Sequence, residues 1–199
     1  MTLRTKARTV LRLGGLSAYA SGVVAAIGLV FLIAMFASFA VGAKSPGLVF
    51  GWINDVVGVV GALLMLPLAA ALHALLRPQA PLLSGLAVLI GIGAMVAIFL
   101  LQLLLVVGAL TFQQQIGPVS IAFLVLVAWF VMTGYLGSSS GSLPHGVRMG
   151  ILAATYVGYP IWALWLGRHL IRLAQEPVSL RAEGWTGTIP PGFANGDDR

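Results

Sequence analysis

Long apolar segments alternate with short stretches of Gly, Pro, Ser and charged residues along most of the chain. The apolar segments cover residues 16–41, 52–76, 81–110, 119–136 and 147–166. A helix needs ~20 apolar residues to cross the roughly 30 Å hydrocarbon core of a bilayer. Backbone groups in lipid must hydrogen-bond within the protein, and the alternation typical of barrel strands is absent, so each segment is predicted to be a helix. The pattern predicts an all-α, polytopic transmembrane helical bundle with about five spanning helices.

Polar sequence flanks this bundle on both sides. We expect a basic N-terminal segment at 1–15, the bundle at 16–172 and a flexible polar C-terminal tail at 173–199, where Pro and Gly are frequent. The first apolar segment could instead belong to a cleaved signal peptide. It is longer than the roughly 7–15 apolar residues of such a peptide, which favours a retained first helix.

Composition supports a membrane location. Hydrophobic residues make up 59% of the chain and charged residues 8%, whereas soluble domains carry about 25% charged residues. The net charge of +6 comes from basic residues beside apolar segments, which indicates membrane topology and contact with anionic headgroups rather than nucleic-acid binding. Because the chain has no cysteine, disulfides, thiolate metal sites and iron–sulfur clusters are excluded.

The distribution of basic residues predicts an orientation. Five crossings place the N-terminal segment, Arg77 and Arg148 on one side, and Lys44 and the C-terminal arginines on the other. The N-terminal cluster flanks the first helix, so we predict a cytoplasmic N-terminus in a bacterial inner membrane. A rival arrangement makes 119–136 re-entrant and puts both termini inside. It separates the charges better, but that segment is too uniformly apolar to avoid crossing.

Small residues recur at helical spacing on several segments. This spacing predicts close helix packing, since small side chains let membrane helices approach. The small residues of the first and fifth segments are Gly14, Ala18, Gly22, Ala26, Gly150, Ala154 and Gly158. The second segment carries a stripe that is polar at both ends and mostly small between, made of Asn54, Gly58, Ala62, Met65, Ala69, His73 and Arg77. We expect the stripe to face other helices, either for packing alone or around a polar crevice.

Five polar side chains within the apolar segments are candidates for a ligand site or polar crevice. They are Asn54, Asp55, Gln102, Tyr156 and Tyr159. Asp55 suits a helix N-terminus or a pair with Lys44 or Arg168, which share its side in the five-crossing arrangement. The two tyrosines flank Pro160, where we expect a kink in the fifth helix.

A second set of candidates lies toward the opposite side, and could contact a lipid headgroup or a cofactor. It comprises His73, Arg77, His145 and Arg148. Two converging histidines would allow haem b, although no cysteine or carboxylate is placed to support such a site. No metal site is predicted. The chain lacks paired carboxylates, a GxSxG motif, a phosphate loop and HExxH, so no catalytic residue is assigned and a non-enzymatic role is favoured.

Two stretches resemble known sequences. They are the run from Trp52 to Gly58 (WINDVVG) and the run from Tyr159 to Arg168 (YPIWALWLGR). Both resemble segments of small uncharacterised bacterial multi-span membrane proteins of a domain-of-unknown-function type. The resemblance implies a bacterial inner-membrane helical bundle and carries over no activity and no catalytic residue.

Three functions are compatible with these features. The first is an accessory or scaffold subunit that packs against a membrane-protein partner or a second copy of itself within the lipid bilayer. The second is a binding or transport module for a lipid or other hydrophobic ligand. The third is a redox subunit that carries haem or quinone. A membrane-spanning cavity between the second, third and fifth helices would favour the ligand-binding module, whereas solid packing there would favour the accessory subunit.

Overall fold

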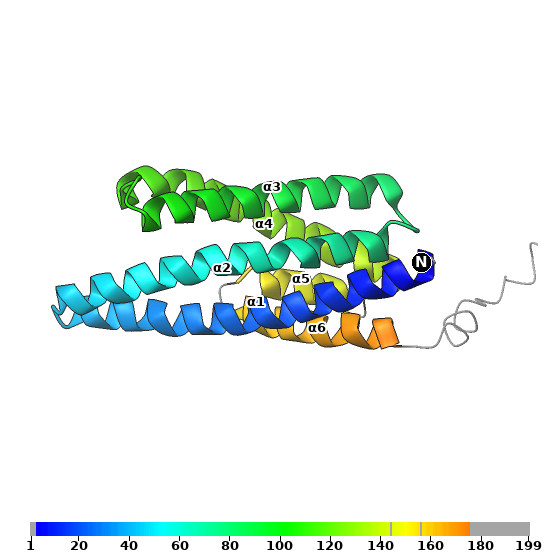
Figure 1. The fold of residues 1–199 in the computed structure, drawn as a ribbon, viewed down its shortest axis with the longest axis horizontal. Helices are drawn as coiled ribbons and strands as arrows, with labels where there is room; N and C mark the ends of the chain where they lie inside the picture. The colour runs from blue at the N-terminus through cyan, green and yellow to red at the C-terminus, as the bar shows by residue number, and fades with distance from the viewer. Residues whose placement is uncertain (1–2, 144, 156, 176–199) are drawn as a thin grey trace, which may run out of the picture.

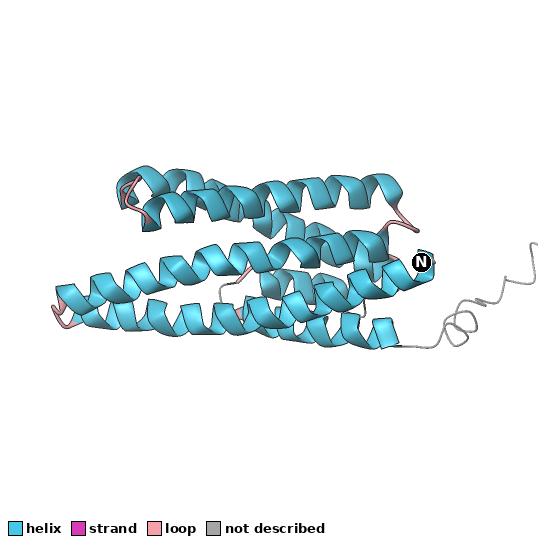
Figure 2. Ribbon diagram, in the orientation of Figure 1, coloured by secondary structure: helices cyan, strands magenta, loops and turns pink. Residues whose placement is uncertain are grey.

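The structure is a computed structural model that describes residues 3–143, 145–155 and 157–175, except for the side chains of residues 3–6 and 147. These residues form helices joined by short turns, and no strand occurs among them (Figure 2). The helices are α1 (Leu3–Ala40), α2 (Lys44–Leu76), α3 (Pro81–Val106), α4 (Phe112–Ser139), α5 (Gly146–Ala153) and α6 (Gly158–Gln175). The chain is therefore an all-α helical bundle, as predicted.

Four of the helices, α1 to α4, are long and apolar enough to cross a membrane. The 26 residues of α3 extend over about 39 Å at 1.5 Å per residue, which exceeds the hydrocarbon thickness. The hairpin of α1 and α2 projects beyond α3 and α4 (Figure 1). The Trp52 side chain marks the level at which α3 ends, because its Nε1 donates a hydrogen bond to the Val106 carbonyl at 3.5 Å.

The predicted fifth spanning helix, 147–166, does not form. Instead, α5 and α6 make a helical hairpin that turns back halfway along the bundle. Helix α5 is antiparallel to α4, because Gly146 packs on Gly134 and Gly150 packs on Phe130. Helix α6 is antiparallel to α1, because Pro160 packs on Gly22 and Gly167 packs on Gly15. The start of α1 and the end of α6 consequently lie at the same end of the bundle (Figure 1).

Local chemistry explains why the chain breaks between α5 and α6. Thr155 Oγ1 donates to the Leu152 carbonyl at 2.8 Å and accepts a hydrogen bond from Gly158 N at 2.9 Å. The Thr155 side chain thus satisfies the backbone N–H of Gly158, the first residue of α6, and a new helix starts there. Pro160 lies in the first turn of α6, where its missing N–H costs nothing. The predicted kink at Pro160 in a continuous fifth helix was therefore wrong.

The six helices form a closed ring of contacts. In chain order each helix packs on the next, and α6 closes the ring against α1. Within the described residues α1 and α4 do not touch, so only the short α5–α6 hairpin connects these two faces. The ring is therefore closed at the end where the hairpin lies, and it opens between α1 and α4 at the other end.

Small residues allow the close approaches in this ring, as the sequence pattern predicted. A Cβ added to Gly15 would lie 2.9 Å from the Gly167 carbonyl oxygen, and one added to Gly150 would lie 2.6 Å from the Phe130 carbonyl oxygen. Both distances are shorter than real Cβ contacts, so backbones touch where α1 meets α6 and where α4 meets α5. Ala18, on the predicted face of α1, is fully buried.

Several predicted boundaries were wrong. The basic segment 1–15 is helical from Leu3 and continues into α1, while α2 begins at Lys44 rather than 52. Pro46 lies between the predicted segments 16–41 and 52–76, where we expected a loop, but it is in the first turn of α2 and therefore starts a helix. Helix α4 starts at Phe112 rather than 119, because Thr111 N donates to Gln114 Oε1 at 2.9 Å and caps it. Helix α6 continues to Gln175, and the rest of the predicted tail, 176–199, lies outside the described residues.

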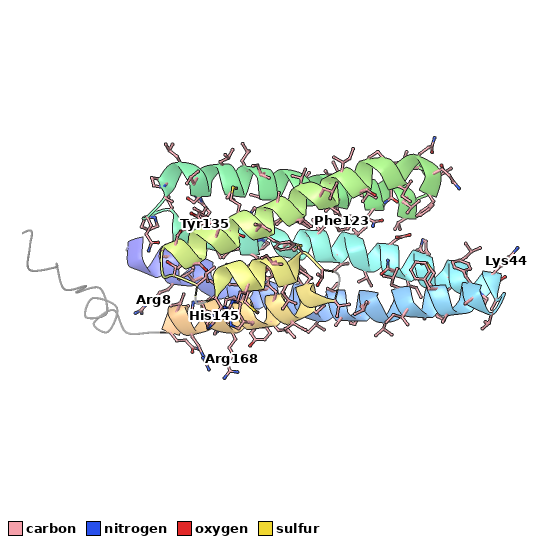
Figure 3. All side chains as sticks on the ribbon, turned by 180° about the vertical axis from the view of Figure 1, so that it is seen from behind. Arg8, Lys44, Phe123, Tyr135, His145 and Arg168 are labelled. Carbon is pink, nitrogen blue, oxygen red and sulfur yellow. The ribbon has the colours of Figure 1, made fainter. Side chains whose placement is uncertain are left out.

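The hairpin also changes the side on which the C-terminal arginines lie. We call the end of the bundle that holds the start of α1 and the end of α6 the basic end. It gathers Arg8, Arg12, Arg77, Arg148, Arg168 and Arg172. Figure 3 shows Arg8, His145 and Arg168 there and Lys44 at the opposite end. Arg168 therefore does not share a side with Asp55, and the predicted pairing of these two residues was wrong.

Candidate functional site

A half-open cavity of about 160 Å³ lies in the middle of the bundle, beside the tip of the α5–α6 hairpin. We call it the mid-bundle cavity. Its lining is almost entirely apolar and comprises Ser21, Val24, Ala25, Gly28, Val57, Gly58, Gly61, Ala62, Met65, Met95, Ile98, Phe123, Leu126, Val127, Phe130, Ala153, Ala154, Thr155 and Tyr159. These residues come from all six helices, with α5 contributing only its last residue, Ala153, and from the turn that follows α5.

The cavity exists because the hairpin stops halfway. In the half of the bundle nearer the basic end, α5 and α6 fill the space between α1 and α4. Beyond Thr155 no described element continues between them, and glycines and alanines line the α1 and α2 walls. Thr155 and Phe123 line the cavity and are also exposed, so its open side lies between α4 and the tip of the hairpin.

An aromatic and hydroxyl cluster forms the floor. The Tyr159 hydroxyl donates a hydrogen bond to Ser21 Oγ at 2.9 Å, and Ser21 Oγ donates to the Ala18 carbonyl at 2.9 Å. The Phe130 ring lies 4.9 Å from the Trp162 ring and 5.6 Å from the Tyr159 ring, measured between centroids. Such edge and tilted contacts hold rings rigidly, so the floor is preformed. Tyr159, a predicted site residue, thus lies at the cavity.

Polar side chains gather near the opposite end of the cavity. The Asn54 Oδ1 atom lies 3.3 Å from the position a Cβ would take on Gly28, which lines the cavity. Gly58, another lining residue, lies against Gln102, whose Nε2 is 3.4 Å from the corresponding Cβ position. Gln115 is buried and donates its Nε2 hydrogen to Gln102 Oε1 at 2.9 Å. The predicted candidates Asn54 and Gln102 therefore adjoin one site.

Asp55 lies on α2 between two residues that contact α3. One turn before it, Trp52 bonds to Val106, and one turn after it, Gly58 packs on Gln102. Asp55 is half-buried and is the only acidic residue among the described ones. Lys44, the one cation at this end among the residues that the structure describes, is eleven residues away, or about 16 Å along α2. A carboxylate within a membrane helix and without a cationic partner is a recognised mark of function.

The stripe predicted on α2 faces other helices, as expected. Gly58, Ala62 and Met65 line the cavity, and Ala69 is 1% exposed. At its far end, His73 Nδ1 lies 3.2 Å from the Ser84 Oγ atom of α3. Polar groups at both ends and a hollow between them match the crevice hypothesis better than packing alone.

The second candidate set lies at the basic end without forming a joint site. His73 pairs with Ser84, whereas His145 is exposed and precedes α5 with a positive φ of 59°. Arg77 and Arg148 are exposed. No group of three or more metal-binding side chains occurs among the described residues. Tyr156 lies outside the described residues.

Sequence reasoning missed three residues that shape these sites. Gln115 was assigned to the turn between the third and fourth segments, whereas it lies in α4 and bonds to Gln102, 13 residues earlier, across the α3–α4 hairpin. Thr155 was read as part of a spanning helix, whereas it lies in the turn before α6 and its Oγ1 accepts a hydrogen bond from Gly158 N. His169 was not considered, and its Nε2 lies 3.0 Å from the Ser142 carbonyl oxygen, joining α6 to the α4–α5 turn.

In comparisons with known proteins, no protein-family model matches this chain, and neither a curated protein nor a solved structure matches it.

Proposed function

We propose that this protein is a plasma-membrane protein that binds a lipid acyl chain or a similar hydrophobic ligand in the mid-bundle cavity. The observation that carries the proposal is the cavity itself, which adjoins α2, α3 and the tip of the α5–α6 hairpin. It is confined to the middle of the bundle, whereas the sequence analysis considered a membrane-spanning cavity. Its volume of about 160 Å³ is close to that of an engineered apolar cavity, about 150 Å³, which takes up benzene.

Packing supplies the driving force for such binding. An acyl chain that moves from the bilayer into the protein gains no hydrophobic free energy, because both surroundings are apolar. It does fill a void whose walls otherwise lack contact partners, and the dispersion gain is collective. Asn54, Gln102 and Asp55 then offer hydrogen-bonding groups at the far end of the cavity, toward the level of Trp52 where α3 ends. A ligand with an apolar tail and a polar head suits this arrangement.

The charge distribution supports an orientation. Among the described residues every arginine lies at the basic end, with Lys44 as the one cation at the other. By the positive-inside rule the basic end faces the cytoplasm. Helices α1 to α4 then cross the bacterial inner membrane, and the α5–α6 hairpin re-enters from the cytoplasmic side. Its turn is compatible with lipid depth because it lines a cavity and its backbone is hydrogen-bonded.

The accessory-subunit hypothesis is the second candidate. A helix of a partner protein could cover the opening between α1 and α4, where α1 exposes Val23, Ile27 and Val30. The size of the cavity favours a single acyl chain as its occupant over a helix, which is about 10 Å in diameter.

A filled-cavity variant tests the proposal. Gly61 lines the cavity, and a Cβ there would meet only Val24 Cγ1, at 3.9 Å. Gly61→Leu therefore fills the cavity without disturbing backbone contacts. Gly93→Leu is the matched control, because nothing lies within 4 Å of a Cβ at Gly93. Each protein is placed in nanodiscs of phosphatidylethanolamine and phosphatidylglycerol that contain a phospholipid with a diazirine in its acyl chain.

Photolabelling followed by peptide mass spectrometry gives the result. The unmodified protein and Gly93→Leu should be labelled at residues around the cavity, such as Phe123 and Met95, and Gly61→Leu should lose that label. Equal labelling of all three proteins, confined to outward-facing residues, would refute acyl-chain binding. Protection of the cavity by a co-purified protein would instead support the accessory subunit.

A further inference from the structure

A second hollow lies at the basic end, between the first turns of α1 and the last turns of α6. It has a volume of about 350 Å³ and is lined by Arg8, Thr9, Arg12, Ile171, Ala174 and Gln175. We call it the interface cleft. The length of α6 separates it from the mid-bundle cavity, and the two hollows share no lining residue. What binds there is therefore independent of the proposed acyl-chain site.

The two arginines are placed to act on one ligand. Arg8 and Arg12 are one helical turn apart, so their side chains leave the same face of α1, and both line the cleft. A guanidinium presents N–H donors in a planar fork that matches phosphate oxygens, and it stays charged at any physiological pH. Thr9 and Gln175, both exposed, add neutral hydrogen-bonding groups to the same walls.

The surroundings strengthen the attraction for an anion. Arg168 and Arg172 are exposed on the same helix that forms the opposite wall, and Figure 3 shows Arg168 near Arg8 at this end. Arg77 and Arg148 lie at the same end of the bundle. No acidic side chain occurs at this end within the part of the chain that the structure describes. Anionic lipid attracts such clusters with roughly 1 kcal/mol for each basic residue.

The depth of the cleft distinguishes a lipid from other anions. Its bottom is closed, because Leu11 and Leu170 are buried just below it and the backbones of Gly15 and Gly167 touch one turn deeper. On the outside of α1, Leu13 and Leu16 are exposed directly beneath Arg12. A phosphate in the cleft can thus have its acyl chains against these leucines, at the depth where the hydrocarbon begins.

From this geometry we infer that the interface cleft binds the phosphate of an anionic phospholipid headgroup, held by Arg8 and Arg12, with the lipid tails along the outer face of α1. The basic end is then a specific lipid site in addition to a determinant of orientation. None of the residues that line the cleft belongs to the two candidate sets of the sequence analysis.

Native mass spectrometry of the full chain tests this inference. The protein is released from nanodiscs that contain equal amounts of phosphatidylglycerol and phosphatidylcholine, and the ratio of the two lipids retained is measured. The unmodified protein should retain phosphatidylglycerol selectively. Arg12→Gln should lower the ratio about fivefold, which corresponds to about 1 kcal/mol, and Arg8→Gln combined with Arg12→Gln should lower it further. Arg12→Lys keeps the charge but loses the fork, so it should give an intermediate ratio.

Matched variants separate a built site from a diffuse charge effect. Lys44→Gln removes one charge at the other end and should leave the ratio unchanged. Arg148→Gln removes one charge at the basic end but outside the cleft, and should change it by less than Arg12→Gln. Equal effects of Arg12→Gln and Arg148→Gln, or none from the double variant, would overturn the inference. So would release of the bound phosphatidylglycerol by millimolar inorganic phosphate alone, because that would identify a free-phosphate site.

The same preparations keep this test separate from that of the mid-bundle cavity. Gly61→Leu should retain phosphatidylglycerol at the cleft even when it loses the acyl-chain photolabel. An unaltered thermal unfolding midpoint for Arg12→Gln shows that a lost preference reflects the cleft rather than the fold.

Discussion

The hydroxyl of Tyr159 donates a hydrogen bond of 2.9 Å to Ser21 Oγ, across 138 residues of sequence. This bond fixes the first turn of α6 to the middle of α1. Together with the hydrogen bond from Gly158 N to Thr155 Oγ1, it sets the height at which the α5–α6 hairpin turns back. The position of this turn determines the floor of the mid-bundle cavity, so one tertiary hydrogen bond helps to position the candidate site.

Breaking this bond should loosen the hairpin measurably. Interhelical hydrogen bonds in membrane proteins contribute about 0.6 kcal/mol on average and at most about 1.7. We expect Tyr159→Phe and Ser21→Ala each to destabilise the protein, and the double variant to show a coupling energy of about 1 kcal/mol in that range. Reversible unfolding in mixed micelles measures these free energies.

An exposed tyrosine provides the control for this cycle. Tyr135 on α4 is 62% exposed, so Tyr135→Phe should change stability by less than about 0.5 kcal/mol. Additive effects of the Tyr159 and Ser21 substitutions would mean that the two side chains act separately and that the hairpin is held by other contacts.

The re-entrant arrangement predicts the same side for the start of α1 and the end of α6. The chain has no cysteine, so single cysteines introduced at Ser45, Gln79 and Gln175 report position without background. In intact bacterial cells a membrane-impermeant maleimide should react with the Ser45→Cys variant only. The Gln79→Cys and Gln175→Cys variants should react after the inner membrane is permeabilised.

The cysteine at position 175 discriminates between the two topologies. Five crossings would place it outside with Ser45 and make it reactive in intact cells. Reaction of Gln79→Cys in intact cells would instead reverse the orientation of the whole bundle and place the basic end outside.

The charge of Asp55 should lower the stability of the protein, although the side chain is expected to contact the polar head of the ligand. It is half-buried in a membrane helix with no cation near it, and such charges are costly. Removing the charge with Asp55→Asn should therefore raise the free energy of unfolding by about 1 kcal/mol, while weakening retention of the ligand's polar head. Lys44→Gln, at an exposed helix end, should change neither quantity. Unfolding and acyl-chain photolabelling are measured on the same samples.

A loss of stability in Asp55→Asn would show that the carboxylate makes a structural contact. Unchanged photolabelling would place Asp55 outside the ligand site and leave Asn54 and Gln102 as its polar end.

Hydrophobic patterning predicted the four helices that are long and apolar enough to cross a membrane, and most of the packing faces. A helix that crosses a bilayer requires a long apolar segment, and close helix packing requires small residues. Both patterns therefore appear directly in the sequence. The glycines of α1 and α5 and the stripe on α2 were found on these grounds. Helix ends were predicted poorly, because Pro46 and Pro160 were treated as a loop and a kink although both lie in first turns.

The sequence by itself determined that the helices suit apolar surroundings, that the fold is helical, and which small residues let the helices approach each other. Each of these depends on local composition and spacing. Only the tertiary structure decided that the last apolar segment folds back. An unbroken helix and a helical hairpin bury similar apolar residues, and the choice between them depends on contacts of Thr155, Tyr159 and Gly167 with distant parts of the chain. That choice brings the arginines to one end, leaves α1 and α4 apart at the other, and thereby creates both the interface cleft and the mid-bundle cavity.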